Sequence, residues 1–134
     1  MQLRLARHPN RLKVKHPILI EELLDLELRG KQKAVAVMLE MLKDLHEKGR
    51  GSRFLNKLTG TPLWELKPAS RGGEKGGSRV YLFLLPDDEA GVVNCEVKDG
   101  VTADREKLRV GLEVVVAYKQ GVRVFEEPGD AEEE

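Results

Sequence analysis

The spacing of apolar residues changes at Gly49, and this change constrains the fold more than any other feature of the chain. Upstream of it, apolar residues recur at helical spacing along one face: Val35, Met38, Leu39, Leu42 and Leu45. Gly49 itself stands where the C-terminal cap of a helix belongs. Downstream, apolar and charged residues alternate, as they do in strands that bury one face. The order therefore predicts helices first and a sheet after them.

A further helix is expected just before this one. Pro17 suits the first turn of a helix, Gly30 ends the run, and between them apolar residues follow at helical spacing: Ile20, Leu23, Leu24 and Leu28. Because only residues 29–31 separate the two predicted helices, they should form a hairpin. Residues 2–15 alternate loosely around a turn-prone His8-Pro9-Asn10, which predicts one or two short strands.

Three strands are predicted after Gly49, near residues 63–68, 79–85 and 91–97. The Gly-rich loop between the first two, residues 71–77, should be a flexible hairpin tip unless a ligand orders it. It is not a phosphate-binding P-loop, because it lacks the Gly-Lys-Ser/Thr ending and joins two strands.

Residues 103–119 fit either a strand or a helix. The run Val114-Val115-Val116 favours a strand. However, Thr102 or Asp104 can cap a helix, and apolar residues keep helical spacing as far as Gly121, so a helix is predicted. Val122–Phe125 could add a short strand. The expected fold is α+β: N-terminal strand(s) and a helical hairpin on one face of a small, mostly antiparallel sheet, with a C-terminal helix closing an end.

Length and composition predict a single domain over residues 1–125 and an acidic, disordered tail over residues 126–134. The tail holds six acidic residues and no basic ones, so the 23 basic and 17 acidic residues of 1–125 leave a net charge of +6. A mildly basic body is compatible with a nucleic-acid partner. One cysteine, no apolar run of ~20 residues and no apolar leader segment predict a cytoplasmic protein without membrane spans or a disulfide framework.

Charged residues on the predicted strands give the first indication of function. Lys57, Lys67 and Arg79 can stand off one sheet, while Leu58, Leu66, Val80 and Leu82 serve packing. Several cations on strands, rather than on loops, suit the binding of a polyanion at a defined place. This arrangement points to RNA.

The chain resembles the RelE/HigB-like toxins of bacterial type II toxin–antitoxin systems, including their phage-derived relatives. Four segments carry the resemblance, in order and spacing: Leu42–Gly49, Asn56–Gly60, Leu63–Lys67 and Ser78–Phe83. It implies a RelE-like fold and an endoribonuclease that cleaves mRNA, usually on the ribosome, inhibits translation, and is neutralised by a cognate antitoxin protein. It also implies a metal-independent reaction without cofactors.

The resemblance also implies site residues. Arg79 matches the family's sheet arginine, whose planar, permanently charged fork can hold phosphate oxygens. Lys67 and Lys98 are the expected catalytic helpers, for charge or proton transfer. Lys57, Arg105 and Trp64 are the expected RNA contacts, although a tryptophan here is more often a core residue.

Two departures from the family keep other functions open. Relatives often carry an aromatic residue or a Lys-Lys pair after the last strand, whereas residues 98–102 hold one lysine and an aspartate, and the acidic tail is also atypical. A non-catalytic RNA- or ribosome-binding protein and a protein-interaction module therefore remain alternatives. Glu65 could be a general base, but an exposed strand carboxylate is the simpler expectation. No metal site is predicted, because the histidines and Cys95 lack metal-ligand spacing.

Overall fold

The computed structural model describes residues 1–9, 16–69, 72–98 and 104–125. In chain order its elements are β1 (Gln2–Leu5), α1 (Ile18–Leu28), α2 (Gln32–Lys48), the 3₁₀ turn η1 (Gly49–Gly51), β2 (Leu55–Lys57), β3 (Trp64–Leu66), α3 (Gly73–Gly76), β4 (Ser78–Leu85), β5 (Glu89–Val97) and α4 (Arg105–Lys119). The predicted acidic tail, residues 126–134, lies outside the described residues.

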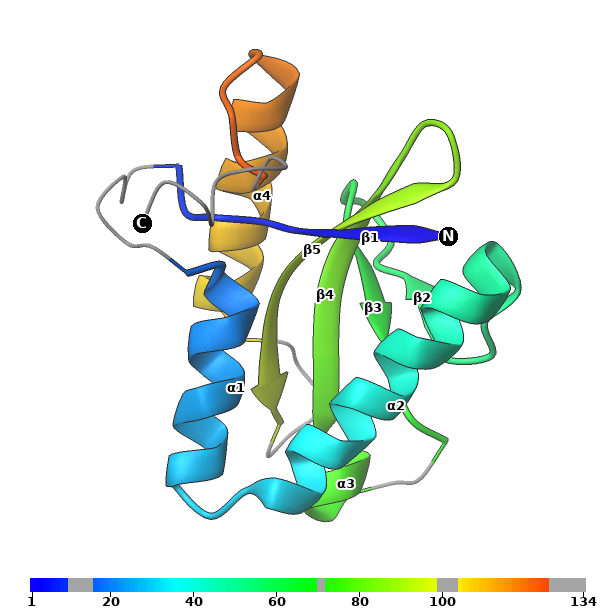
Figure 1. Cartoon of the computed structure of the whole chain (residues 1–134), viewed down its shortest axis with the longest axis vertical. Helices are drawn as coiled ribbons and strands as arrows, with labels where there is room; N and C mark the ends of the chain where they lie inside the picture. Colours follow the sequence, from blue (N-terminus) through cyan, green and yellow to red (C-terminus); the bar gives the residue numbers. More distant parts are fainter. Residues whose placement is uncertain (10–15, 70–71, 99–103, 126–134) are drawn as a thin grey trace, which may run out of the picture.

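Five strands form one sheet in the order β1-β5-β4-β3-β2 (Figure 1). β1 runs parallel to β5, and the other neighbours are antiparallel. The prediction of an α+β fold with a mostly antiparallel sheet is therefore confirmed. The long hairpin of β4 and β5 forms its centre, with a register shift between Tyr81 and Leu82.

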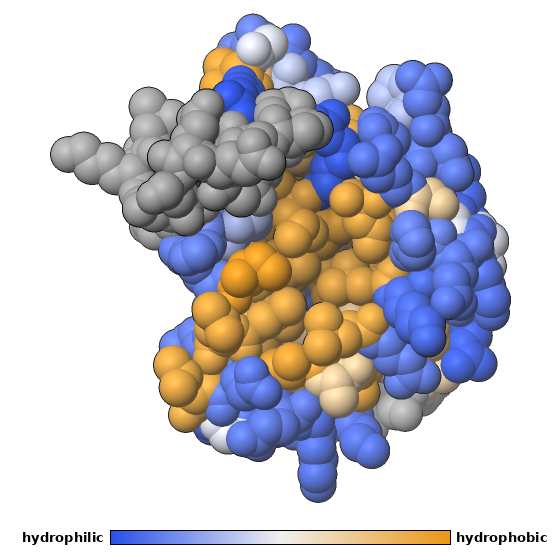
Figure 2. All heavy atoms as spheres, viewed as in Figure 1, coloured by the Kyte–Doolittle hydropathy of each residue, from blue (hydrophilic) through white to orange (hydrophobic). Residues whose placement is uncertain are grey.

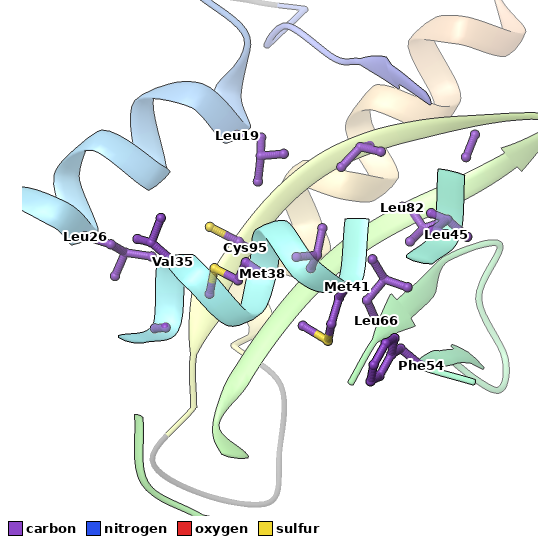
Figure 3. Packing of buried hydrophobic residues seen from close by; sticks show 14 residues of the cluster. Leu19, Leu26, Val35, Met38, Met41, Leu45, Phe54, Leu66, Leu82 and Cys95 are labelled. Atoms are coloured by element: carbon purple, nitrogen blue, oxygen red, sulfur yellow. The ribbon is translucent and has the colours of Figure 1, made fainter. Parts of the chain in front are cut away.

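The two predicted N-terminal helices form a hairpin on one face of the sheet. Gly30 and Gly49 end the helices with φ angles of +79° and +57°, a backbone conformation that favours glycine. A buried cluster joins the helices to the sheet, and Figure 3 shows its side chains converging from α1, α2 and the strands. It includes Leu19, Leu26, Val35, Met38, Met41, Leu45, Leu66, Val80, Leu82, Val92 and Cys95.

The buried face of α1 differs from its apolar stripe in the sequence. Leu19 and Leu26 are the buried leucines, whereas Leu24 and Leu28 are 54% and 88% exposed. On α2, Leu39 is 52% exposed. The helices diverge from their connection, and Figure 2 shows hydrophobic residues gathered on the surface between them. An exposed apolar area of this kind is often an interaction site.

The C-terminal helix α4 packs against the opposite face of the sheet. Its Val114 and Val115 lie in a second cluster with Leu63 and Phe83. The helical interpretation of this segment is confirmed, and the strand alternative is wrong. Asp104 caps the helix as predicted, since its Oδ1 accepts a hydrogen bond from Glu106 N at 2.8 Å. Packing against one face of the sheet therefore overrides the strand preference of three consecutive valines.

Some local predictions need correction. β2 was not among the three strands predicted by range, although its Lys57 was expected to stand off the sheet, and it pairs antiparallel with β3. Gly73–Gly76 forms the helical turn α3 in the loop that was expected to be a flexible tip. At the N-terminus the described residues contain one strand, β1, and Val122–Phe125 contributes a single bridge, between Phe125 and Ala6. Residues 10–15, where a second strand was possible, lie outside the described residues.

Candidate functional site

Strand alternation divides the residues of β3 and β4 between two environments. Leu66, Val80 and Leu82 face the helical hairpin and belong to its buried cluster. Their neighbours Glu65, Arg79 and Tyr81 therefore face the other side of the sheet, where α4 packs. The register places Glu65 opposite Tyr81, and Tyr81 opposite Asn94 of β5. Arg79 is opposite Glu96. A row of polar residues thus crosses three strands on this face, and it forms the candidate site.

Arg79 is more buried than a cation that simply stands off a sheet. It is 8% exposed, and its Nη1 donates hydrogen bonds to the carbonyl oxygens of Gly76 and Ser78 at 2.7 and 2.9 Å. The turn α3 supplies the first of these carbonyls. Arg79 Nε lies 3.8 Å from Glu65 Oε2, close enough for charge attraction but too far for a hydrogen bond. Nε has no hydrogen-bond partner among the described residues.

Glu65 is also buried more deeply than expected. Its side chain is 12% exposed, so the prediction of an exposed strand carboxylate is wrong. The reason is its place on β3, opposite Tyr81 and beside the guanidinium of Arg79. Its carboxylate lies beside Arg79 on the face of the candidate site, which makes it a candidate proton acceptor for a substrate hydroxyl.

Tyr81 and Glu96 form the best-defined hydrogen bond of the site. The Tyr81 hydroxyl donates to Glu96 Oε2 at 2.8 Å, and the backbone N–H of Asp104 donates to the same oxygen at 3.1 Å. Burial, and then the hydrogen bond to the Glu96 carboxylate, raises the pKa of Tyr81 far above its ordinary value of 10. The tyrosine therefore remains a protonated hydrogen-bond donor at physiological pH.

The first turns of α4 are attached to this face by further polar contacts. Asn94 Nδ2 donates to the Lys107 carbonyl at 3.0 Å, and the Lys107 ammonium forms an ion pair with Glu22 of α1. Asn94 Oδ1 is buried and has no hydrogen-bond partner among the described residues. The start of α4 is thus positioned by the same residues that form the site.

Three more predicted residues lie at this end of the sheet. Lys67 is exposed and directly follows β3. Because Leu66 is opposite Val80, the next position in the same register places Lys67 beside Arg79. The backbone N–H of Lys98 donates to the Gly77 carbonyl at 2.7 Å, so the β4–β5 ladder continues two residues beyond Glu96. Arg105 is exposed and is the first residue of α4. The structure therefore brings Lys67, Lys98 and Arg105 to the end of the sheet that carries Arg79.

Lys57 and Trp64 are separated from this group by the sheet itself. They are opposite each other in the β2–β3 register, and Trp64 is opposite Leu82, so both face the helical hairpin. Lys57 Nζ lies 5.2 Å from the centre of the Trp64 ring, within the range of a cation–π contact. Trp64 is partly buried and packs against the hairpin cluster, which agrees with the preferred interpretation as a core residue.

Three residues of the site were not predicted from the sequence: Tyr81, Asn94 and Glu96. A signal for them was present, because Tyr81 lies two residues after Arg79 and strand alternation gives both the same face. The β4–β5 register was needed to find Asn94 and Glu96.

The chain matches no model of a known protein family and no curated protein sequence. Within the described ranges, no three His, Cys, Asp or Glu side chains are grouped so as to hold a metal ion. In the same ranges, no helix has the length and apolar character needed to cross a membrane. The site is therefore interpreted from its own chemistry: an arginine near two carboxylates, a tyrosine hydroxyl, and lysines and an arginine at the same end.

Proposed function

We propose that this protein is a RelE/HigB-like endoribonuclease that cleaves mRNA, on the ribosome, and inhibits translation. One observation supports the proposal most strongly: Arg79 lies 3.8 Å from Glu65, on the sheet face opposite the helical hairpin, at the end where Lys67, Lys98 and Arg105 collect. RNA cleavage at a phosphodiester needs a base, cations and an acid at one place. The neighbouring side chains can supply all three.

The proposed reaction is an in-line transfer within the RNA. Glu65 removes the proton from a ribose 2′-hydroxyl as its oxygen bonds to the adjacent phosphorus. Arg79 stabilises the additional negative charge on the phosphate oxygens through its permanent positive charge, since its Nη1 is already bonded to two backbone carbonyls. The bond from phosphorus to the 5′-oxygen breaks, and Lys67 or Lys98 donates a proton to that oxygen. The products are a 2′,3′-cyclic phosphate and a 5′-hydroxyl end.

The proposed partners are mRNA, the ribosome and a cognate antitoxin, all in the cytoplasm. Arg105, at the same end as Arg79, and Lys57, on the other face, are proposed phosphate contacts, and Trp64 is a proposed stacking contact where its ring is exposed. For the antitoxin, the apolar surface between α1 and α2 is the proposed contact area.

The chemistry is tested by incubating the purified protein with a 5′-labelled mRNA, with and without ribosomes, and analysing the ends of the fragments. The proposal predicts cyclic-phosphate ends, and cleavage by Glu65→Gln reduced by roughly 100-fold or more with RNA binding retained. Glu89→Gln, at the far end of the β4–β5 hairpin, is the matched control and should cleave normally. Fragments with 3′-hydroxyl ends would contradict the mechanism.

A second function, binding RNA or the ribosome without cleavage, is favoured by one specific observation. Arg79 Nη1 already donates to two backbone carbonyls, which is also what a purely structural arginine does. This alternative predicts salt-dependent RNA binding with intact RNA. A protein-interaction module on the same fold predicts no salt-dependent RNA binding at all.

A further inference from the structure

The strand β2 is the last strand of the sheet, and no strand among the described residues pairs with its outer side (Figure 1). Asn56 and Lys57 are exposed and Leu55 is half-buried, so this outer edge is accessible to solvent. An accessible strand edge is a template on which another extended chain can form hydrogen bonds. A short edge strand that carries a lysine also discourages unselected pairing, so charge should decide which chain binds.

The β2–β3 register identifies which backbone groups of β2 are already used. The Lys67 N–H donates to the Phe54 carbonyl at 2.9 Å, and the Leu58 N–H donates to the Leu63 carbonyl at 3.1 Å. Hydrogen-bonded positions alternate along an antiparallel strand. Asn56, which lies between Phe54 and Leu58, therefore also directs its backbone groups toward β3.

The two neighbours of Asn56, Leu55 and Lys57, direct their backbone groups away from the sheet. The Leu55 N–H donates to the Ser52 carbonyl at 3.2 Å. In the part of the chain that the structure describes, the Leu55 carbonyl and both backbone groups of Lys57 have no hydrogen-bond partner. A strand antiparallel to β2 would therefore exchange hydrogen bonds with Lys57 in both directions and donate one to the Leu55 carbonyl.

The chain around this edge is strongly basic. Residues 48–67 hold five basic residues, all of them exposed: Lys48, Arg50, Arg53, Lys57 and Lys67. The one acidic residue in this range, Glu65, lies on the sheet face where α4 packs, 3.8 Å from Arg79. It is therefore already beside a cation of its own.

Lys57 is the basic residue that lies on the edge itself. It has no acidic partner among the described residues, and its Nζ lies 5.2 Å from the centre of the Trp64 ring. By contrast, Lys48 is paired with Asp44 of α2 at 3.1 Å. An acidic side chain placed beside Lys57 would gain a charge partner, whereas a basic one would be repelled.

The side chains of β2 define the sequence that an added strand needs. Directly opposite side chains of an antiparallel pair lie on the same face, about 4.5–5.5 Å apart at Cβ. The residue opposite Lys57 should therefore be acidic. The residue two positions later lies opposite Leu55, which packs against the hairpin cluster, so it should be apolar.

Two other occupants fit this edge less well. The outward carbonyls of Leu55 and Lys57 would repel the phosphates of RNA, whereas they can accept hydrogen bonds from the N–H groups of a peptide. A second copy of this chain, paired edge to edge, would bring the same basic residues together from both sides.

We propose that the outer edge of β2 binds an extended, acidic segment of a protein partner. The segment adds to the sheet antiparallel to β2 and exchanges backbone hydrogen bonds with Lys57. It places a glutamate or aspartate beside the Lys57 ammonium and an apolar side chain beside Leu55. Because this binding uses neither Arg79 nor Glu65, it does not depend on ribonuclease activity.

The test titrates an acetylated, amidated pentapeptide, Thr-Glu-Thr-Val-Thr, into the ¹⁵N-labelled full chain while amide signals are followed by NMR. Two analogues are compared, one with lysine in place of the glutamate and one N-methylated at the glutamate amide, which removes the donor to the Lys57 carbonyl. We expect saturable shifts at Leu55 and Lys57 and no binding of the methylated peptide. The affinity for the glutamate peptide should be about tenfold above that for the lysine peptide.

Charge reversal on the protein separates this site from non-specific attraction. Lys57→Glu should reverse the preference, so that the lysine peptide binds about tenfold more tightly than the glutamate peptide. Lys33→Glu, an exposed residue in the first turn of α2, should keep the wild-type preference within about twofold. An unchanged preference in Lys57→Glu would overturn the proposal.

The same titrations expose the other occupants. Equal affinities of the wild type for the glutamate and lysine peptides, shifts confined to other surfaces, or no saturable shifts at about 5 mM peptide would each overturn the proposal. So would shifts at Leu55 and Lys57 produced by a single-stranded RNA oligonucleotide but not by the peptide, or by self-association of the chain alone.

Discussion

The hydroxyl of Tyr81 donates a hydrogen bond to Glu96 Oε2 at 2.8 Å, and the same oxygen accepts the backbone N–H of Asp104 at 3.1 Å. One carboxylate oxygen therefore connects β4, β5 and the residue that caps α4. This connection lies on the sheet face that carries Arg79. The position of α4 and the geometry of the candidate site therefore both depend on the Glu96 carboxylate.

Removing the hydroxyl should destabilise the fold measurably. For Tyr81→Phe we expect a loss of about 1.5–3 kcal/mol in the free energy of unfolding, the range for hydrogen bonds to charged groups. Urea unfolding measures it. Tyr118→Phe is the control, because Tyr118 makes ring contacts with Phe83 and Phe125 that phenylalanine keeps, and it should change stability by less than about 0.5 kcal/mol. Equal losses in the two variants would contradict the importance of the Glu96 contact.

Gly77 should tolerate no side chain. A Cβ there would lie 2.8 Å from the Gly73 carbonyl and still closer to that of Lys98, and backbone atoms cannot move aside easily. We expect Gly77→Ala to lower the free energy of unfolding by about 1–3 kcal/mol, as overpacking does, and to displace Lys98 from the site. Gly51→Ala is the matched control, since a Cβ at Gly51 meets nothing within 4 Å. Equal free energies of unfolding for the Gly77→Ala and Gly51→Ala variants in urea would contradict tight packing at Gly77.

Asp44 should make stability depend on pH in acid. The Ser52 hydroxyl donates to Asp44 Oδ2 at 2.6 Å and, with the Lys48 ammonium nearby, holds the pKa of Asp44 below its ordinary value of 3.8. The folded state therefore binds the proton less readily than the unfolded chain. The stabilisation is present above pH 3.8 and is lost as the pH falls through the lowered pKa.

The expected result is a pH-dependent difference between the wild type and Asp44→Asn. Urea unfolding at pH 7 should show the variant to be less stable, and the difference should shrink below pH 3.8. Glu47→Gln, an exposed residue of the same helix, should show no such trend. A stability difference that is constant from pH 7 to pH 2 would contradict the assignment.

If Lys57 contacts an RNA phosphate, its loss should weaken binding equally for all RNA sequences. We expect Lys57→Ala to reduce the slope of log affinity against log salt concentration by about one. Fluorescence anisotropy with a labelled single-stranded RNA measures it. Lys33→Ala, an exposed lysine in the first turn of α2, tests whether any surface cation has this effect. Identical slopes for the two variants would contradict a specific role for Lys57.

Much of the fold could be predicted from the sequence because its elements have strong local signals. Helical spacing before Gly49, alternation after it, and the caps at Gly49 and Asp104 correspond to α2, the central strands and α4. The short strand β2 was missed, since three residues carry too little alternation to recognise. Its pairing with β3 is a tertiary effect.

The candidate site was less accessible to sequence reasoning, for a physical reason. Alternation gives the face of a residue only relative to its own strand, whereas the register between strands decides which residues meet. Lys57 and Arg79 are both strand cations, yet they lie on opposite faces because Lys57 pairs with Trp64. Likewise, the burial of Arg79 and Glu65 results from the turn α3 and the neighbouring strands, which no local pattern indicates.

The central claim is that Arg79 enables RNA cleavage. The most direct measurement is growth and mRNA integrity in bacterial cells induced to express either the wild type or Arg79→Lys, at equal levels of folded protein. The lysine keeps one positive charge and one donor group but loses the planar guanidinium, whose Nη1 bonds the carbonyls of both Gly76 and Ser78. We predict growth arrest with mapped mRNA cuts for the wild type, and cuts reduced roughly 100-fold for the variant. Intact mRNA and normal growth with folded wild-type protein would contradict the account.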